Sequence, residues 1–181
     1  MNSIEARTDL KARDLTELAA LVAELGWEPY RARQLFTWLW QKGATEFEVM
    51  TNLARAKREQ LKARARVSAL AELGRTQAPD GTTKFRFGLE DGLRVETVFI
   101  PEPPRKTVCV STQVGCPLGC AICFTGKSGF RRNLKFHEIA DQVLQVGSRI
   151  AAVGPGGRGV RQRGARGDAV EDLRHGALAG R

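Results

Sequence analysis

Apolar residues recur every three or four positions in three segments near the start of the chain, which is the spacing of helices that bury one face. The first predicted helix begins at Asp14, which has capping-box spacing to Glu17, and it ends at Leu25. Two further helices are predicted at about residues 30–42 and 53–66. Together the three segments predict a small α-helical module.

Two features of these helices bear on RNA binding. In the second helix Trp40 lies on the apolar face and Trp38 points elsewhere, so either ring could stack on a base, although core packing is the more frequent role. The third helix has many basic residues against the single acid Glu59, which fits either a phosphate-contacting surface or an ordinary solvated face. Its basic residues are Arg55, Lys57, Arg58, Lys62, Arg64 and Arg66.

After the third helix the apolar period changes to two, which is the period of strands. Residues 83–88 and 93–100 alternate in this way, and Asp91–Gly92 between them is a turn signal, so they predict a β-hairpin. In the second strand Glu96 shares a face with apolar neighbours. The pattern alone favours a strand-edge or salt-bridged carboxylate there, paired for example with Arg94.

Beyond the hairpin, prolines within residues 101–104 mark a linker, residues 107–112 predict a strand, and residues 136–146 predict a helix. The apolar residues of this helix are spaced for burial, and they are Phe136, Ile139, Val143 and Val146. From residue 147 the chain is rich in arginine and glycine and has no apolar periodicity. That composition predicts a disordered tail, or sequence replaced by a frameshift.

Composition narrows the choice of partners. The 181-residue chain has 29 lysines and arginines against 20 acids, which gives a net charge of +9. This excess favours polyanionic partners such as nucleic acid over acidic substrates. No apolar segment is long enough to span a bilayer, and residues 1–7 are mostly polar, so we expect a cytoplasmic protein without a membrane partner.

The candidate chemistry centres on Cys116, Cys120 and Cys123, at spacings of four and three residues. Thiolates bind soft metals and iron–sulfur clusters, and three of them leave one iron of a [4Fe-4S] cluster open to a small molecule. A zinc site is the alternative, with Cys109 or His137 as the fourth ligand of a nucleic-acid-binding module. Structural disulfides are disfavoured, because nothing in the sequence indicates secretion.

The segment around these cysteines closely resembles the radical S-adenosylmethionine (SAM) adenine-C2 methyltransferases of rRNA and tRNA, the RlmN/Cfr family. The resemblance extends from about residue 15 to about residue 146. Ile122 is a departure, since the family usually has an aromatic residue before the third cysteine. The segment that carries the resemblance most strongly is residues 105–134, RKTVCVSTQVGCPLGCAICFTGKSGFRRNL.

The resemblance implies a fold of the α/β class. Residues 1–67 would form an RNA-binding-like helical module, and residues 68–104 a β-hairpin and linker. Residues 105–146 would be the start of an incomplete radical SAM (β/α) barrel that carries the cluster loop, and residues 147–181 a disordered or frameshifted tail. In barrel enzymes the chemistry lies at the carboxyl ends of the strands, which is where the three cysteines follow the predicted strand.

The resemblance also implies cofactors, partners and roles. A [4Fe-4S] cluster would be held by Cys116, Cys120 and Cys123 and would bind SAM, with an electron-donor protein, 23S rRNA and tRNA as partners. Glu96 matches the family's proposed base, and burial beside apolar groups would raise its pKa. Cys109 matches the cysteine that resolves a covalent protein–RNA intermediate by thiol exchange, so a disulfide bond is also expected.

Two family features do not appear in this sequence: a glycine–glutamate–proline motif that helps bind SAM, and a late cysteine that carries the methyl group, since no cysteine follows Cys123. On this basis we expect a truncated or frameshifted chain that is inactive alone, with a non-catalytic RNA-binding fragment as an alternative. Basic residues after the motif could hold phosphate or substrate, or solvate a loop. They are Lys127, Arg131, Arg132 and Lys135.

Overall fold

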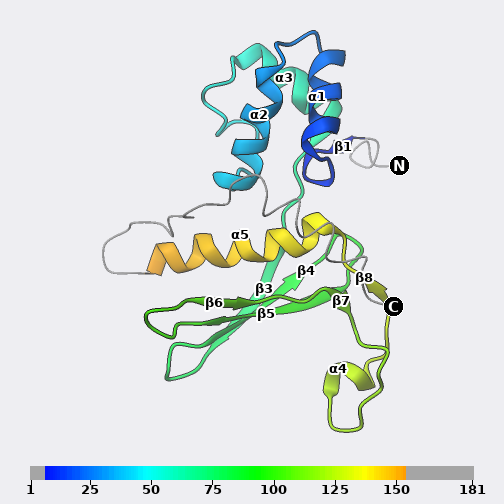
Figure 1. Cartoon of the computed structure of the whole chain (residues 1–181), viewed down its shortest axis with the longest axis vertical. Helices are drawn as coiled ribbons and strands as arrows, with labels where there is room; N and C mark the ends of the chain where they lie inside the picture. Colours follow the sequence, from blue (N-terminus) through cyan, green and yellow to red (C-terminus); the bar gives the residue numbers. More distant parts are fainter. Residues whose placement is uncertain (1–6, 154–181) are drawn as a thin grey trace. The chain divides into compact units, whose positions relative to one another are not determined.

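The computed structural model describes residues 7–153, which divide into two compact units between Ala69 and Leu70. Figure 1 draws the N-terminal unit in blue and cyan and the C-terminal unit in green to orange. The predicted tail from residue 154 onward lies outside the described residues. Within the described part, no helix is long and apolar enough to cross a membrane.

The N-terminal unit is helical, as the apolar pattern predicts. Its elements are β1 (Thr8–Asp9), the 3-10 helix η1 (Leu10–Ala12), α1 (Leu15–Glu24), α2 (Tyr30–Phe36), the π-helix η2 (Thr37–Gln41), α3 (Arg55–Arg64) and β2 (Ala65–Arg66). The capping box of α1 is confirmed, because Glu17 N–H donates to Asp14 Oδ1 and Asp14 N–H donates to Glu17 Oε2, both at 2.8 Å. The short strands β1 and β2 pair in parallel.

The second predicted helix changes its winding partway along, which corrects one expectation. Where α2 ends, η2 continues as a π-helix, and the consecutive residues Trp38, Leu39 and Trp40 are all buried. Trp38 therefore does not point away from the core; it is 9% exposed, and its Nε1–H donates to Asn52 Oδ1. A π turn holds one more residue than an α turn, so it shifts the register of the side chains and brings Trp38 to the buried side as well. Within this unit neither ring is free to stack on a base.

The C-terminal unit is built on a four-stranded antiparallel sheet with the order β3-β4-β5-β6 (Figure 1). Its strands are β3 (Ala71–Gln77), β4 (Thr83–Gly88), β5 (Arg94–Ile100) and β6 (Thr107–Cys109). The β4–β5 hairpin confirms the sequence prediction, with Thr83 opposite Phe99 and Gly88 opposite Arg94. Strand β3 was not expected, because most of its side chains are exposed and a bulge between Glu72 and Gly74 breaks its alternation.

One face of this sheet is covered by α5 (Phe136–Val153), and the core lies between them (Figure 1). Phe85 and Phe87 are almost completely buried there, with parallel rings 5.9 Å apart. Helix α5 is longer than predicted, so residues 147–153 are helical rather than part of the tail. Its buried stripe also differs: Val143 is 43% exposed, and Gln142 takes the inward position.

The predicted start of a (β/α) barrel is not seen as such. Strand β6 pairs antiparallel with β5, with Val98 opposite Cys109, and it forms one edge of the sheet. In the described residues of this unit, no strand pair is parallel. The barrel therefore stays a prediction, and what the structure describes is a mixed α/β fold.

Candidate functional site

The three cysteines of the motif lie on a long loop between two short paired strands. These strands are β7 (Gln113–Val114) and β8 (Arg132–Asn133), which run antiparallel with Val114 opposite Arg132. Two further backbone hydrogen bonds extend the pairing, from Arg131 N–H to Val114 O and from Leu134 N–H to Thr112 O, both 2.9 Å. The loop therefore leaves and returns at the same place, and we call residues 115–130 the cysteine loop.

The neck of the cysteine loop is held narrow by glycine. Gly115 has φ +76°, and a Cβ atom placed on it would lie 1.7 Å from Gly129 O. Only a residue without a side chain allows the two backbones to approach so closely. Gly129 also has a positive φ, +71°, so both sides of the neck adopt a conformation that other residues rarely take.

Replacing Gly115 with alanine is expected to open this neck. The control is Gly119→Ala, since Gly119 has a similar positive φ of +58° but nothing within 4 Å of a Cβ. Both variants bear the backbone penalty, and only Gly115→Ala adds a collision with backbone. We expect Gly115→Ala to lower the free energy of unfolding by at least about 2 kcal/mol more than Gly119→Ala does, as measured by urea denaturation. Equal losses would contradict the role of the close approach.

The cysteine thiols are accessible on this loop. Cys120 and Cys123 are exposed and Cys116 is half-buried. Cys123 precedes the short helix α4 (Phe124–Lys127), and hydrogen bonds from the backbone N–H groups of Gly126 and Thr125 lower the pKa of its thiol. The apolar side chains of the loop are exposed too, and they include Leu118, Ile122 and Phe124.

The donor set fits an iron–sulfur cluster in its chemistry, but the thiols do not converge. Within residues 7–153 no group of three or more His, Cys, Asp or Glu side chains could hold a metal ion. All four cysteines are free, so the disulfide bond that the resemblance implies is not found. His137, the other candidate zinc ligand, is buried on α5. Binding a cluster would therefore require the cysteine loop to draw its thiols together.

Glu96 and Cys109 lie on the same face of the sheet. Cys109 is directly opposite Val98, and Val98 is two residues from Glu96 on β5, so all three side chains project from one side. This is the face opposite α5, and both Glu96 and Cys109 are exposed on it. The structure thus brings the two residues near each other as diagonal neighbours on adjacent strands, at the edge from which the chain runs to the cysteine loop.

The surroundings of Glu96 correct the expectation of burial. Its side chain is 55% exposed, and Oε1 is 3.1 Å from Nζ of Lys84 on β4. The pairing is thus the salt bridge that the pattern alone favours, with Lys84 rather than Arg94 as the partner. Alternation along β5 correctly predicted which residues share a face, but it could not tell which face α5 would cover.

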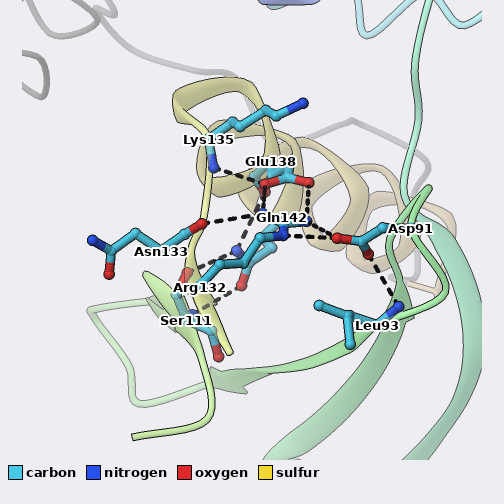
Figure 2. Close-up of polar contacts among 8 residues, drawn as sticks. All are labelled: Asp91, Leu93, Ser111, Arg132, Asn133, Lys135, Glu138 and Gln142. Carbon is cyan, nitrogen blue, oxygen red and sulfur yellow. Dashed lines mark hydrogen bonds and ion pairs between the residues drawn. The ribbon is translucent and has the colours of Figure 1, made fainter. Parts of the chain in front are cut away.

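A network that sequence reasoning missed holds the base of the cysteine loop (Figure 2). Arg132 lies between two carboxylates: Nη1 and Nη2 donate to Glu138 at 2.8 Å each, and Nε donates to Asp91 Oδ2 at 2.7 Å. Glu138 also accepts from Lys135 N–H at 2.7 Å. Burial alone would raise the pKa of Glu138, but these hydrogen bonds lower it below its usual range. Arg132 is therefore structural rather than a free phosphate ligand.

The basic helix α3 is partly neutralised within its own unit. Lys57 lies 3.0 Å from Glu28, and Lys62 forms ion pairs with Glu48 and Glu59. Arg55 and Arg64 are exposed and, among the described residues, have no ion pair. A phosphate-contacting surface on α3 would therefore be narrower than its sequence suggests.

Comparison with known proteins places these features in a family. Residues 8–67 match the family described as the ribosomal RNA large subunit methyltransferase N-terminal domain. The chain is 45% identical over 148 residues to a dual-specificity RNA methyltransferase RlmN of Anaeromyxobacter dehalogenans, covering 82% of this chain and 40% of that protein. It is 44% identical over 143 residues to the RlmN of Geobacter sulfurreducens, covering 79% and 40%.

A solved structure agrees with the sequence relatives. The crystal structure of a radical SAM methyltransferase from Sphaerobacter thermophilus superposes with a TM-score of 0.73 at 38% identity, covering 82% of this chain and 44% of that one. The chain thus spans about two-fifths of the length of the curated relatives it matches. In sequence and in fold, this chain belongs to the RlmN family of radical SAM methyltransferases, with which it shares their amino-terminal part.

Proposed function

We propose that this chain supplies the amino-terminal part of an enzyme that transfers a methyl group from SAM to C2 of adenine in 23S rRNA and tRNA. The observation that carries the proposal is the placement of Glu96 and Cys109 on one open sheet face, at the edge that leads to the loop with three accessible thiols. A reaction on these RNAs would take place in the cytoplasm, and the net charge of +9 suits a polyanionic partner.

Cys116, Cys120 and Cys123 would hold the [4Fe-4S] cluster and leave its fourth iron for SAM. When bound, the cluster would supply the electron that cleaves SAM reductively, and an electron-donor protein would have to replace that electron. The glycine neck sets where the loop starts and ends, while the exposure of its thiols leaves them free to converge. The exposed apolar side chains of the loop would exclude water around the site once it is covered.

Glu96 would act as the base that takes the proton from C2 of the adenine. Its exposure leaves one side of the carboxylate open to RNA, while the Lys84 ammonium 3.1 Å away holds the other side in place. The Cys109 thiolate would then attack the sulfur that links protein to RNA. A disulfide forms as the sulfur–carbon bond breaks, and the released carbon takes up a proton.

A chimera tests this function, since the chain matches a defined segment of longer relatives. The matching segment of the Geobacter sulfurreducens RlmN is replaced by this chain's segment in cells without their own enzyme, and 2-methyladenosine in 23S rRNA is measured by mass spectrometry. We expect the chimera to restore the modification. Glu96→Gln should reduce it at least about 100-fold, because a positioned base contributes that much.

The matched control for that experiment is Glu102→Gln in the same chimera, since Glu102 is also exposed but lies beyond β5 in the linker. Equal modification by the two variants would rule out Glu96 as the base. A folded chimera that binds 23S rRNA fragments in gel-shift assays but never modifies them would favour the non-catalytic RNA-binding alternative.

A further inference from the structure

Gln142 on α5 is the most deeply buried of the polar side chains that this helix turns inward, which also include Glu138 and Asp141. It is 0% exposed, and its Oε1 accepts hydrogen bonds from Thr97 Oγ1 at 2.8 Å and from Ser111 N–H at 2.9 Å. Its Nε2 donates to Ser111 O at 2.9 Å and to Glu138 O at 3.3 Å. The amide thus uses both acceptor positions and both donors, so a buried group that would be costly alone is fully satisfied.

Beside Ser111, the side chain of Gln142 makes the backbone hydrogen bonds that a neighbouring strand would otherwise make. Strand β6 ends at Cys109, and its last paired residue is Cys109 itself, opposite Val98. Two residues later, the Gln142 amide pairs with both the N–H and the C=O of Ser111, as a neighbouring strand would (Figure 2). The backbone N–H and C=O of Ser111 are therefore paired with one side chain from α5 and not with a neighbouring strand.

The same residues reach the segment that carries Glu96. Thr97, which donates to Gln142, is the next residue after Glu96, and Ser111 Oγ donates to Glu96 O at 2.7 Å. A single buried amide thereby connects both sides of the site: it bonds the side chain of Thr97, next to Glu96, and the backbone of Ser111, two positions beyond Cys109. The two exposed side chains project from the opposite face of the sheet.

We propose that Gln142 is a positioning residue that fixes Cys109 relative to Glu96 through Ser111 and Thr97. That the spacing between Cys109 and Glu96 matters for catalysis rests on the proposed function. That Gln142 holds the two residues in place can be tested without it. Without Gln142, two backbone groups of Ser111 lose buried partners, and the segment after Cys109 opens more often.

The experiment compares Gln142→Met with Gln145→Met in the full chain. Methionine has nearly the volume of glutamine but cannot form these bonds, and Gln145 lies one turn further along α5, where it contacts Asp141 and Arg149 instead. We expect amide hydrogen exchange at Ser111 to accelerate about tenfold or more in Gln142→Met only. The rate of Cys109 alkylation, read by peptide mass mapping, should change about threefold or more relative to the rate of Cys120 in the same sample.

The ratio of the two alkylation rates separates positioning from general loss of stability, because global unfolding would expose both cysteines alike. Thr97→Val provides a milder second variant, since it removes only one bond to Gln142 and should shift both readouts in the same direction. A folded Gln142→Met protein with unchanged exchange at Ser111 and an unchanged ratio would overturn the proposal. None of these readouts needs cluster, SAM or RNA, so failure here would leave the methyltransferase proposal untouched.

Discussion

Replacing Arg132 with methionine is expected to lower the free energy of unfolding of the C-terminal unit by about 2–3 kcal/mol. Arg132 links Asp91, in the β4–β5 turn, to Glu138, in the first turn of α5. Glu138 is the more buried of the two acids, with 9% of its side chain exposed, and the variant would remove both guanidinium hydrogen bonds and keep the one from Lys135 N–H. The value is below that of a fully buried pair because Arg132 is 28% exposed.

The same variant should change how stability depends on pH. Burial opposes ionisation of Glu138 and Asp91, but their hydrogen bonds, above all those with Arg132 for Glu138, lower the pKa of each carboxyl. A lowered folded-state pKa contributes stability above the unfolded value, 4.5 for Glu138, that is lost as pH falls through the folded value. In Arg132→Met this acid-side loss should shrink, because without the guanidinium the burial of Glu138 favours its protonated form.

Urea denaturation between pH 3 and pH 7 measures both effects. Arg131→Met is the matched control, since Arg131 is the exposed neighbour of Arg132 on the same segment. Arg132→Lys should recover only part of the loss, because an ammonium cannot donate to Glu138 in the two-bond geometry of the guanidinium. If Arg131→Met and Arg132→Met cost the same at pH 7, the network does not hold the unit together.

Local sequence patterns predicted those parts of the fold that depend on neighbouring residues. The capping box at Asp14 and Glu17 and the β4–β5 hairpin follow from spacing over a few positions, and both are confirmed. Strand β3 was not predicted, because it is an edge strand that buries few side chains and its bulge between Glu72 and Gly74 interrupts the period of two. The burial of Trp38 depends on a π-helix, which a short pattern of apolar residues does not predict.

The candidate site shows the same division. The spacing of the cysteines and the placement of Glu96 and Cys109 on strands could be predicted from the sequence. The exposure of Glu96 could not, because it depends on which face of the sheet α5 covers. The structural role of Arg132 and the inward position of Gln142 both depend on tertiary partners distant in sequence. One signal was available, since Gln142 lies three residues after Ile139 within the apolar stripe of α5.

Alanine variants of the four cysteines should distinguish an iron–sulfur cluster from a zinc site, because they are expected to change the bound metal almost completely. A cluster of the proposed kind takes three protein thiolates, whereas a structural zinc site takes four ligands and would need Cys109, since the alternative ligand His137 is buried on α5. After anaerobic reconstitution with iron and sulfide, we expect about four irons per chain in the unmodified protein and near-complete loss in Cys116→Ala, Cys120→Ala and Cys123→Ala.

Cys109→Ala is the decisive control, because Cys109 is exposed, like Cys120 and Cys123, but lies on β6, outside the cysteine loop. It should retain the full iron content and the brown absorption, since the loop would close around the cluster without it. A colourless protein that binds one zinc, and loses it equally in all four variants, would reject the cluster. Because β6 is paired to β5 and the loop thiols are not held together, a fourth ligand from Cys109 would have to bring the loop onto the sheet face beside Glu96. That arrangement would block the open face on which the proposed chemistry depends.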